Sequence, residues 1–222
     1  MAKPFIDIQQ QIEQGIVILR RGGLVAYPTD TVYGLGAAIN QPQAVKRVYA
    51  AKGRPSNSPL PVLLADVSQI TDVADRVPAS AQCFIRNFFP GALTLVLPRS
   101  KAVPAVVAGG GDTVAVRVPD HPVPLALIKG LGVPIVGTSA NLSGRPSPLT
   151  AGEVENQLGK MIDLIVDGGR CPGGKESTII DVTGETPVIL REGAIPREEL
   201  ERVCGHIATS PRVILRNPGK SG

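Results

Sequence analysis

The sequence predicts an α/β fold built around a mixed sheet. Short apolar runs typical of strands alternate along the chain with segments in which apolar residues recur at helical spacing. Some connections between neighbouring strand segments are too short for the crossover that parallel strands require, so we expect antiparallel pairs in the same sheet. No Ser/Gly-rich linker or charge run divides the 222 residues. We therefore expect one domain over residues 1–205, followed by a partly disordered tail over residues 206–222.

The N-terminal elements have clear boundaries in the sequence. Apolar residues recur at helical spacing from about residue 5 to 21, and Gly22-Gly23 then stops the helix. The apolar run that follows, residues 24–27, is predicted to be a strand. Pro42 stands at the first position of a second helix, where its fixed φ is favourable, and this helix should run to about Ala51.

The later elements follow the same alternation. A third helix is expected over residues 80–88, because Pro90-Gly91 ends it. Runs of alternating or continuous apolar residues indicate strands. The remaining strands are expected at residues 61–64, 93–97, 113–118, 133–137, 162–166 and 178–182, and the remaining helices at about residues 122–130, 151–159 and 196–203.

Composition restricts the class of protein. Apolar residues make up 43% and charged residues 19%, which is typical of a soluble globular chain. Aromatic residues make up only 3%, too few for a surface that binds single strands by base stacking. No apolar run approaches the about 20 residues that cross a bilayer, and the N-terminus lacks the apolar core of a secretory leader. We therefore expect neither secretory export nor a membrane-spanning segment, and no membrane partner. The cysteine pattern favours a reducing, cytoplasmic location.

Cysteines, histidines and net charge restrict the kind of site. Cys83, Cys171 and Cys204 are odd in number and widely spaced, which argues against a disulfide framework and a zinc knuckle. His121 and His206 have no suitably placed Cys or His nearby, so no histidine metal centre is expected. The net charge of +4 favours anionic partners such as a nucleotide or RNA.

Three familiar motifs are incomplete. Residues 169–175 match the first seven positions of a phosphate-binding P-loop, but Glu176 stands at the eighth position and a strand follows where the motif requires a helix. Residues 34–36 lack the third glycine of a dinucleotide-binding fingerprint, because Ile39 occupies its place. Ser139 lacks the G-x-S-x-G turn of hydrolases, which argues against acyl-serine catalysis.

A binding loop is predicted directly after the strand at residues 24–27. Residues 28–36 read Pro-Thr-Asp-Thr-Val-Tyr-Gly-Leu-Gly. Thr29 and Thr31 supply hydroxyl groups that donate and accept hydrogen bonds. Gly34 and Gly36 can adopt backbone angles that other residues avoid, and they let a ligand approach the main chain closely.

Cationic residues stand at the ends of several predicted elements, beside hydroxyl and amide groups. They are Lys52, Arg54, Arg117, Lys175 and Arg191. Arginine binds carboxylate and phosphate through two parallel hydrogen bonds, and lysine acts on phosphate as a point charge. Because open α/β sheets build small-molecule sites at strand ends, the set predicts a clamp for phosphate and carboxylate groups.

These motifs occur in an order that resembles a known family. The segments are P-T-D-T-V-Y-G-L-G at 28–36, K-G-R-P at 52–55, S-P-L at 58–60, P-G at 90–91, V-R-V-P at 116–119, T-S-A-N-L-S-G at 138–144, S-T-I at 177–179 and L-R-E-G at 190–193. Together they cover about residues 10–203. The series is similar to that of the YrdC-type L-threonylcarbamoyladenylate synthases, which prepare the threonylcarbamoyl group for adenosine 37 of transfer RNA.

The resemblance implies both a fold and a reaction. The fold would be a YrdC-like three-layer α/β structure, in which a mixed, twisted, open sheet carries a deep basic cavity. The reaction would be a nucleotidyl transfer that joins L-threonine, bicarbonate and ATP into threonylcarbamoyl-AMP and releases pyrophosphate. Mg²⁺ would be bound mainly through the nucleotide, which needs no carboxylate cage. Downstream proteins that transfer threonylcarbamoyl to tRNA are implied as partners.

The resemblance also implies roles for individual residues. The threonine site would consist of Thr31, Arg117, Ser139 and Ser177, with Arg117 on the threonine carboxylate. The ATP site would consist of Lys52, Arg54, Ser58, Thr113, Asn141 and Arg191, with Lys52 against the phosphates. Lys52 and Arg54 would also be the catalytic residues.

Two other functions stay open. Some family members carry a second C-terminal domain, whereas this chain has only about twenty residues after the core, so it resembles the single-domain members. A non-catalytic module of the same fold would use the basic concavity to bind tRNA or double-stranded RNA. A carbamoyl-transfer module of the hydrogenase-maturation type would be accompanied by zinc-finger and acylphosphatase regions, for which the chain has neither the cysteines nor the length.

Overall fold

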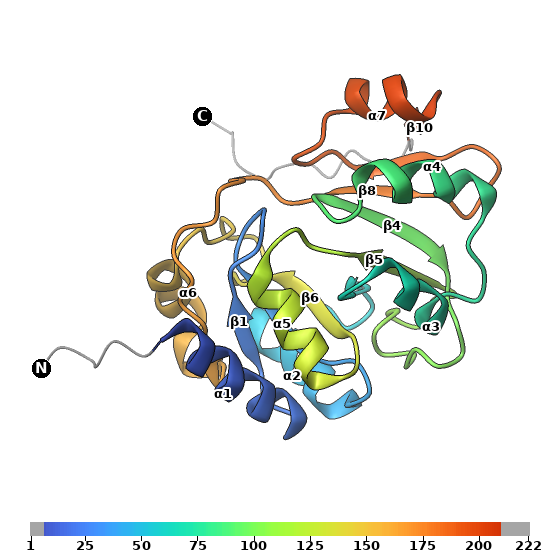
Figure 1. Ribbon diagram of the computed structural model, residues 1–222. Coiled ribbons are helices and arrows are strands. Elements are labelled where there is room, and N and C mark those ends of the chain that lie inside the picture. The colour runs from blue at the N-terminus through green and yellow to red at the C-terminus, as the bar shows by residue number, and fades with distance from the viewer. Residues whose placement is uncertain (1–6, 210–222) are drawn as a thin grey trace, which may run out of the picture.

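One large sheet organises residues 7–209, which are the residues that the computed structural model describes (Figure 1). The strands are β1 (Val25–Tyr27), β2 (Gly34–Ala38), β3 (Val62–Leu63), β4 (Leu93–Pro98), β5 (Thr113–Arg117), β6 (Ile135–Ser139), β7 (Leu164–Ile165), β8 (Thr178–Asp181), β9 (Val188–Arg191) and β10 (Ala208–Thr209). Their order across the sheet is β10-β9-β8-β4-β5-β3-β6-β2-β1-β7. Most of the predicted tail, residues 210–222, lies outside the described residues.

Helices connect most of these strands, as the alternation in the sequence predicts. They are α1 (Ile8–Arg20), α2 (Pro42–Lys52), α3 (Ile70–Val73), α4 (Ala79–Phe88), α5 (Pro122–Leu131), α6 (Ala151–Leu158) and α7 (Arg197–Cys204), with 3₁₀ turns η1 (Val67–Gln69) and η2 (Gly159–Met161). The expected α2 is confirmed at both ends. Pro42 lies in its first turn, and Gly53 ends it with a left-handed φ of 59°, so Lys52 is the last helical residue.

The sheet is mixed, which confirms the prediction from the short connections. The pairs β1/β7, β3/β5, β4/β8 and β9/β10 are parallel, and the pairs β1/β2, β2/β6, β3/β6, β4/β5 and β8/β9 are antiparallel. The antiparallel pair β1/β2 follows from its short connection, since residues 28–33 are too few for a parallel crossover.

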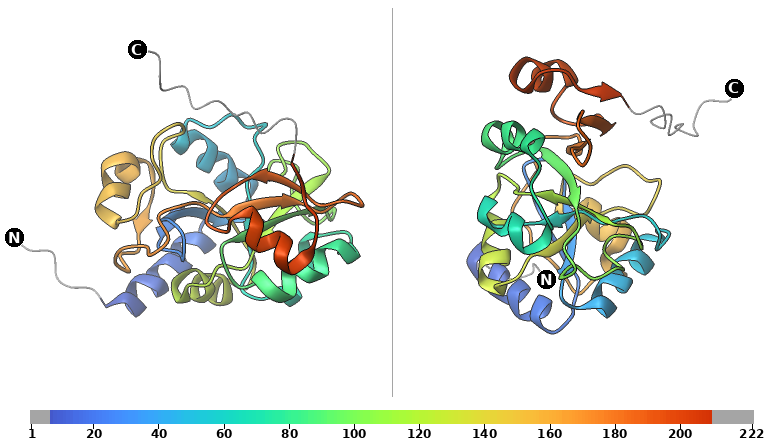
Figure 2. Two further views of the ribbon diagram at one scale, coloured as in Figure 1. Left: turned by 90° about the horizontal axis from the view of Figure 1, so that it is seen from above. Right: turned by 90° about the vertical axis from the view of Figure 1, so that its right-hand side faces the viewer.

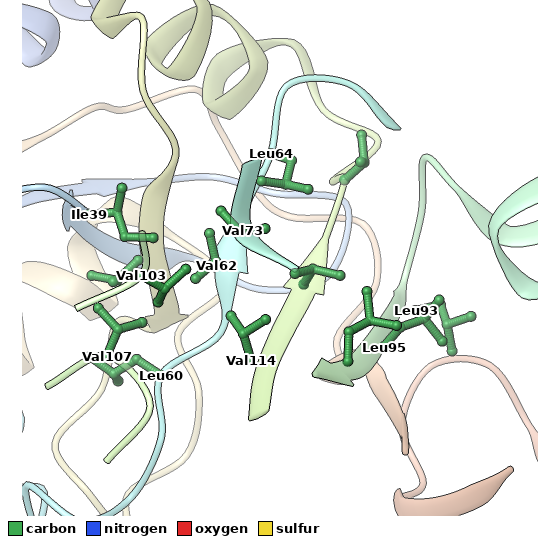
Figure 3. Close-up of a cluster of buried hydrophobic side chains, with 14 of the residues drawn as sticks. Ile39, Leu60, Val62, Leu64, Val73, Leu93, Leu95, Val103, Val107 and Val114 are labelled. Carbon is green, nitrogen blue, oxygen red and sulfur yellow. The ribbon is translucent and has the colours of Figure 1, made fainter. Parts of the chain in front are cut away.

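Two hydrophobic cores lie on the two faces of the sheet. Val62 and Val116 pair directly across β3 and β5, and Leu95 pairs with Val116, so all three face the larger core. Figure 3 shows Val62 and Leu95 in this core. The opposite face carries Tyr27 and Leu63, which pack with α1 and α5 in the smaller core. The strands on this second face extend beyond α1 and α5, which leaves room for a cavity.

A disulfide joins two helices near one end of the sheet. Cys83 on α4 is bonded to Cys204 at the end of α7, with Cα atoms 5.7 Å apart and 121 residues between them in sequence. Figure 2 shows α4 and α7 side by side in both views. The expectation of no disulfide was therefore wrong, because packing of α7 on α4 brings together cysteines whose sequence spacing gives no sign of it. Cys171 is a free, buried thiol.

The described helices are also too short or too polar for a bilayer. Within residues 7–209, none combines the length and the apolar character needed to cross a membrane.

Candidate functional site

A cavity of about 590 Å³ opens on the sheet face that α1 and α5 cover only in part. Strand pairing explains its lining, because Thr94 on β4 faces Ile179 on β8, and Val96 faces Ala115 on β5. Residues that pair directly share one face of a sheet, so these side chains all point to the cavity. The volume is in the range of small-molecule sites. Five basic side chains and one acidic side chain line it, as expected for a basic cavity.

Most of the predicted site residues meet in this cavity. It is lined by Thr31, Lys52, Arg54, Arg117, Ser139, Asn141, Ser177 and Arg191. Ser58 and Thr113 do not line it. Thr113 opens β5 opposite Pro98, two residues before the lining residue Ala115. Lys175, which the sequence placed in the cationic clamp, is exposed and does not line the cavity, so the structure leaves it outside the clamp.

Arg117 ends β5 and is buried, with 6% of its surface exposed. Its guanidinium donates to Asp30 Oδ1 at 2.6 Å, to Thr31 Oγ1 at 3.0 Å and to the carbonyl of Gly91 at 2.8 Å. The ion pair with Asp30 compensates the cost of burying the charge. Each terminal nitrogen carries a second N–H, so the guanidinium can still bind a carboxylate.

The loop between β1 and β2 is fixed by its own hydroxyls. Thr29 Oγ1 accepts hydrogen bonds from the N–H groups of Thr31 and Val32 and donates to the Val32 carbonyl at 2.7 Å. The Thr31 hydroxyl lies 2.9 Å from that of Thr29, which orients it toward Arg117. Gly174 N–H donates to the Thr31 carbonyl, so the incomplete P-loop segment supports this loop and then leads into β8.

Gly34 and Gly36 have a different role from the predicted one. Both belong to β2, and neither has a positive φ. Their missing side chains leave room for the ring of Tyr27 on β1, because a Cβ would lie 2.8 Å from Tyr27 Cε2 at Gly34 and 2.9 Å from Cε1 at Gly36. These glycines are therefore required by packing across strands and not by their backbone angles. Gly34 also lines the cavity, so its main chain is accessible there.

Lys52 reaches the cavity from the end of α2. Its ammonium donates to the carbonyl of Ser139, to the carbonyl of Asn141 at 2.8 Å and to Asn141 Oδ1 at 3.1 Å. Burial lowers the pKa of Lys52 to about 8. Arg54 also lowers this pKa, whereas Glu176 raises it. Lysine has three donors, so the last residue of β6 and the loop after it already engage all of them.

Asn141 organises the loop after β6. Its Oδ1 accepts from Ser139 Oγ at 2.6 Å, and its Nδ2 donates to the carbonyls of Leu142 at 3.0 Å and Arg145 at 2.6 Å. The side chain is buried and thereby connects Lys52 to the loop that carries Arg145. Arg54 is held differently, since it donates to the carbonyls of Ser58 at 3.4 Å and Pro59 at 3.0 Å.

Arg191 and Glu176 form an ion pair on another wall of the cavity. Arg191 Nη1 lies 2.6 Å from Glu176 Oε2, and Nη2 donates to the Ser177 carbonyl at 2.8 Å. Burial alone would raise the pKa of Glu176, but Arg191 and the Ser147 hydroxyl together lower it below its ordinary value. The Ser177 hydroxyl lies 2.8 Å from that of Thr94. This wall therefore presents a cation and two hydroxyls together.

The sequence prediction missed four residues of the site, Asp30, Thr94, Arg145 and Glu176. Thr94, Arg145 and Glu176 line the cavity, and Asp30 pairs with the lining residue Arg117. Asp30 lies inside the predicted binding loop, so its position was a usable signal. Glu176 stands in a polar segment before a predicted strand and breaks the P-loop pattern, but no role was predicted for it because its partner Arg191 is 15 positions away.

Comparison with known proteins agrees with the fold. The Sua5/YciO/YrdC family model, described as "Telomere recombination", matches residues 17–193. This range includes every residue predicted for the site.

Two curated relatives carry the name threonylcarbamoyl-AMP synthase. The protein of Pyrococcus abyssi is 46% identical over 213 residues, covering 94% of this chain and 63% of the relative. The protein of Bacillus subtilis is 48% identical over 198 residues, covering 89% of this chain and 57% of the relative. The chain therefore spans about three fifths of the length of these two relatives.

A solved structure has the same fold. The crystal structure of P. abyssi Sua5 complexed with L-threonine superposes with a TM-score of 0.89 and 46% identity, covering 93% of this chain and 60% of that protein.

Proposed function

The chain belongs to the Sua5/YciO/YrdC family, and we propose that it is an L-threonylcarbamoyladenylate synthase. It would be a nucleotidyltransferase that joins L-threonine, bicarbonate and ATP into threonylcarbamoyl-AMP and pyrophosphate. One observation carries the proposal: a single cavity combines a buried arginine beside hydroxyls with several further cations. The first group suits an amino-acid carboxylate, and the second suits a polyphosphate.

The proposed threonine site is the inner wall around Arg117. The guanidinium would bind the threonine carboxylate through the N–H groups that its present partners leave free. Hydroxyls of Thr31, Ser139 and Ser177 line the same cavity and would contact the threonine amine and side-chain hydroxyl. The crystal structure of P. abyssi Sua5 complexed with L-threonine supports this choice of amino acid.

The proposed nucleotide site combines Lys52, Arg54 and Asn141 with Arg191 on the other wall of the same cavity. The positive charges of Lys52, Arg54 and Arg191 would neutralise the phosphates and position the α-phosphorus for attack. Ser58 and Thr113, which also match nucleotide positions of the family, do not line the cavity, and a role for them would require them to contact the parts of ATP that extend beyond it.

The chemistry needs alignment and charge compensation more than a protein nucleophile. The threonine amine attacks the bicarbonate carbon, and loss of water gives a carbamate. A carbamate oxygen then attacks the α-phosphorus of ATP, and the bond to the pyrophosphate oxygen breaks. Cations fixed around the phosphates stabilise the charge that develops on the leaving pyrophosphate. A site rich in Arg, Lys and hydroxyls fits this requirement.

Mg²⁺ is proposed to enter with the nucleotide. Within residues 7–209, no group of three or more His, Cys, Asp or Glu residues is arranged to hold a metal ion, so the phosphates and water would supply most ligands. The bound ion would add positive charge at the phosphates. We further propose a cytoplasmic location and delivery of the adenylate to proteins that transfer threonylcarbamoyl to tRNA.

The RNA-binding alternative has less support than the synthase. The net charge of +4 is compatible with either a nucleotide or RNA. The cavity of about 590 Å³, lined by five basic side chains and one acidic side chain, suits a small anionic substrate better than a duplex.

The proposal is tested by measuring pyrophosphate release with single substrates left out. We expect release from ATP only when threonine and bicarbonate are both present, with threonylcarbamoyl-AMP detected in equal amount by mass spectrometry. Replacing threonine with valine, which lacks the hydroxyl, should reduce the rate strongly. Release of pyrophosphate at the same rate without threonine would refute the proposed function.

A further inference from the structure

Arg145 differs from the other cations of the cavity. Arg117 and Arg191 are paired with carboxylates, and Lys52 donates to three oxygens of Ser139 and Asn141. Arg54 donates to two backbone carbonyls. Arg145 also lines the cavity, but its guanidinium makes no hydrogen bond or ion pair with any residue in the range 7–209.

The backbone that carries Arg145 is nevertheless firmly held at its near end. Gly144 has a φ of 82°, which forms a turn that only glycine adopts without strain. Arg145 N–H donates to the Leu142 carbonyl at 3.0 Å, and the Arg145 carbonyl accepts from Asn141 Nδ2 at 2.6 Å. Since Asn141 Oδ1 also accepts from Lys52, one amide connects the ammonium of Lys52 to the backbone of Arg145.

The far end of the same loop is held by two other side chains. Gln157 on α6 accepts from the Leu142 N–H through Oε1 and donates to the Pro146 carbonyl through Nε2, both at 3.1 Å. Ser147 Oγ donates to Glu176 Oε1 at 2.7 Å. The loop is thus anchored to α6 and to the wall that holds Arg191. Its backbone is fixed while the guanidinium that it presents has no partner among residues 7–209.

A fixed loop that adds an unpaired cation to an already basic cavity is unfavourable until an anion binds. The cavity has five basic side chains and one acidic one, so like charges repel in the empty state. Arg145 is exposed and also lines a second, smaller hollow with Glu153 and Gln157, whereas Arg117, the proposed carboxylate partner, is buried. Of the proposed substrates, the polyphosphate of ATP carries the most charge and is the longest.

We infer that Arg145 binds the phosphate chain of the nucleotide in the cavity, an inference that rests on the proposed function. The guanidinium donates two hydrogen bonds to phosphate oxygens, on the side of the cavity where Asn141 also fixes Lys52. It has no contact with the threonine carboxylate. Arg145 is therefore a residue for binding the triphosphate and holding the leaving pyrophosphate, and it contributes little to binding of AMP.

The test measures binding of ATP and of AMP to the full chain by isothermal titration calorimetry with Mg²⁺ present. Arg145→Ala should weaken ATP binding about tenfold, the effect of one charge-assisted contact, and leave AMP and threonine affinity unchanged. Arg145→Lys should recover part of the loss. Arg86→Ala removes the same charge from an exposed position on α4 outside the cavity, and it should leave ATP affinity unchanged.

Several outcomes would overturn the inference. The first is an ATP affinity of Arg145→Ala equal to that of the unaltered chain. The second is that Arg145→Ala loses AMP affinity as much as ATP affinity. The third is that Arg86→Ala loses as much ATP affinity as Arg145→Ala. Far-ultraviolet circular dichroism and a urea titration establish that each variant is folded. The proposed function is judged separately. If the unaltered chain binds no ATP, the proposed function is refuted. If the unaltered chain binds ATP and Arg145→Ala binds it equally well, only the role of Arg145 is refuted.

Discussion

Arg117 is the residue whose loss should affect threonine most. Arg117→Ala removes the proposed carboxylate partner and leaves Asp30, a largely buried carboxylate, without its ion pair. We expect threonine binding to weaken by about 2–5 kcal/mol, which is about 30-fold or more, and ATP binding to change little. Titration calorimetry with each substrate measures both. Arg117→Lys keeps the charge but not the paired N–H groups, so its threonine affinity should lie between that of the unaltered chain and that of Arg117→Ala. Unchanged threonine affinity in Arg117→Ala would remove this assignment.

Lys52 should make nucleotide binding depend on pH. Because its pKa is lowered to about 8, the ammonium loses its charge as the pH rises through that value. We expect ATP affinity to fall between about pH 7.5 and 9.5. Glu176→Gln removes the negative charge that raises this pKa, so the midpoint of the fall should move to lower pH. ATP affinity that stays constant across this range would show that the charge of Lys52 does not contribute to binding.

The lowered pKa of Lys52 affects the stability of the fold in the opposite direction from ATP binding. The unfolded lysine titrates near 10.5, so between about pH 8 and 10.5 the unfolded chain binds more protons than the folded one. Burying the charged form costs stability below pH 8, and this cost is relieved as the pH rises. The contribution of Lys52 to the free energy of unfolding therefore increases over the range in which ATP affinity falls.

At the residue scale, the sequence predicted the kinds of groups in the site better than their partners. Arg117, Arg191 and Lys52 stand at element ends, where local pattern alone marks them as accessible cations. Their partners Asp30, Glu176 and Ser139 come from distant segments, and only the folded sheet brings each pair together. Arg145 was missed because nothing in its local sequence separates it from an ordinary exposed arginine.

At the scale of elements, glycine in β6 fixes the shape of the cavity floor. A Cβ at Gly137 would lie 2.5 Å from Leu63 Cγ and 3.2 Å from the Tyr27 hydroxyl, in the centre of the sheet. Gly137→Ala should therefore lower the free energy of unfolding by about 1–3 kcal/mol and weaken substrate binding. Urea unfolding and titration calorimetry measure the two effects.

Gly152 provides the matched control. It lies in α6 and has no positive φ, and no atom lies within 4 Å of the position that a Cβ would occupy, so alanine fits there. Gly152→Ala should be neutral or raise the free energy of unfolding by up to about 1 kcal/mol, because alanine favours helix. If Gly137→Ala and Gly152→Ala changed the free energy of unfolding equally, the role assigned to Gly137 in the cavity floor would be contradicted.

Elements with a strong periodic pattern were predicted well, and elements shaped by their neighbours were not. The helix starting at Pro42 is confirmed because proline and glycine mark its two ends locally. The strand β2 was missed, since two of its five residues are glycines that weaken a strand signal. Packing of Tyr27 against these glycines stabilises β2, and that contact arises only after β1 and β2 pair.

At the scale of the whole molecule, the disulfide should contribute to stability. It closes a loop of 121 residues and joins α7, the last described helix, to α4. Reduction should lower the free energy of unfolding by about 2–4 kcal/mol, since the cross-link restricts the unfolded chain. Urea unfolding with and without reductant tests this. The free energy of unfolding of Cys204→Ser, which cannot form the disulfide, should be the same with and without reductant. Equal stability of the oxidised and reduced chain would contradict the expectation.

The class of fold was predictable because it depends on patterns that extend along the whole chain. Alternating strands and helices with short connections predict a mixed α/β sheet, and that is what the structure has. The strand order was not predicted, because β8 and β4 become neighbours only through pairing of residues that are 85 positions apart in the sequence, such as Leu93 and Thr178. The partial cover by α1 and α5, which opens the cavity, depends on that order.

The central claim is that one cavity holds an amino acid beside a nucleoside triphosphate. The most direct test is a crystal structure of the chain with L-threonine and a non-hydrolysable ATP analogue. We expect both molecules in this cavity, with the threonine carboxylate on Arg117 and the phosphates against Lys52, Arg54 and Arg191. Threonine bound away from Arg117, or a nucleotide bound on another face while the cavity stays empty, would contradict the claim.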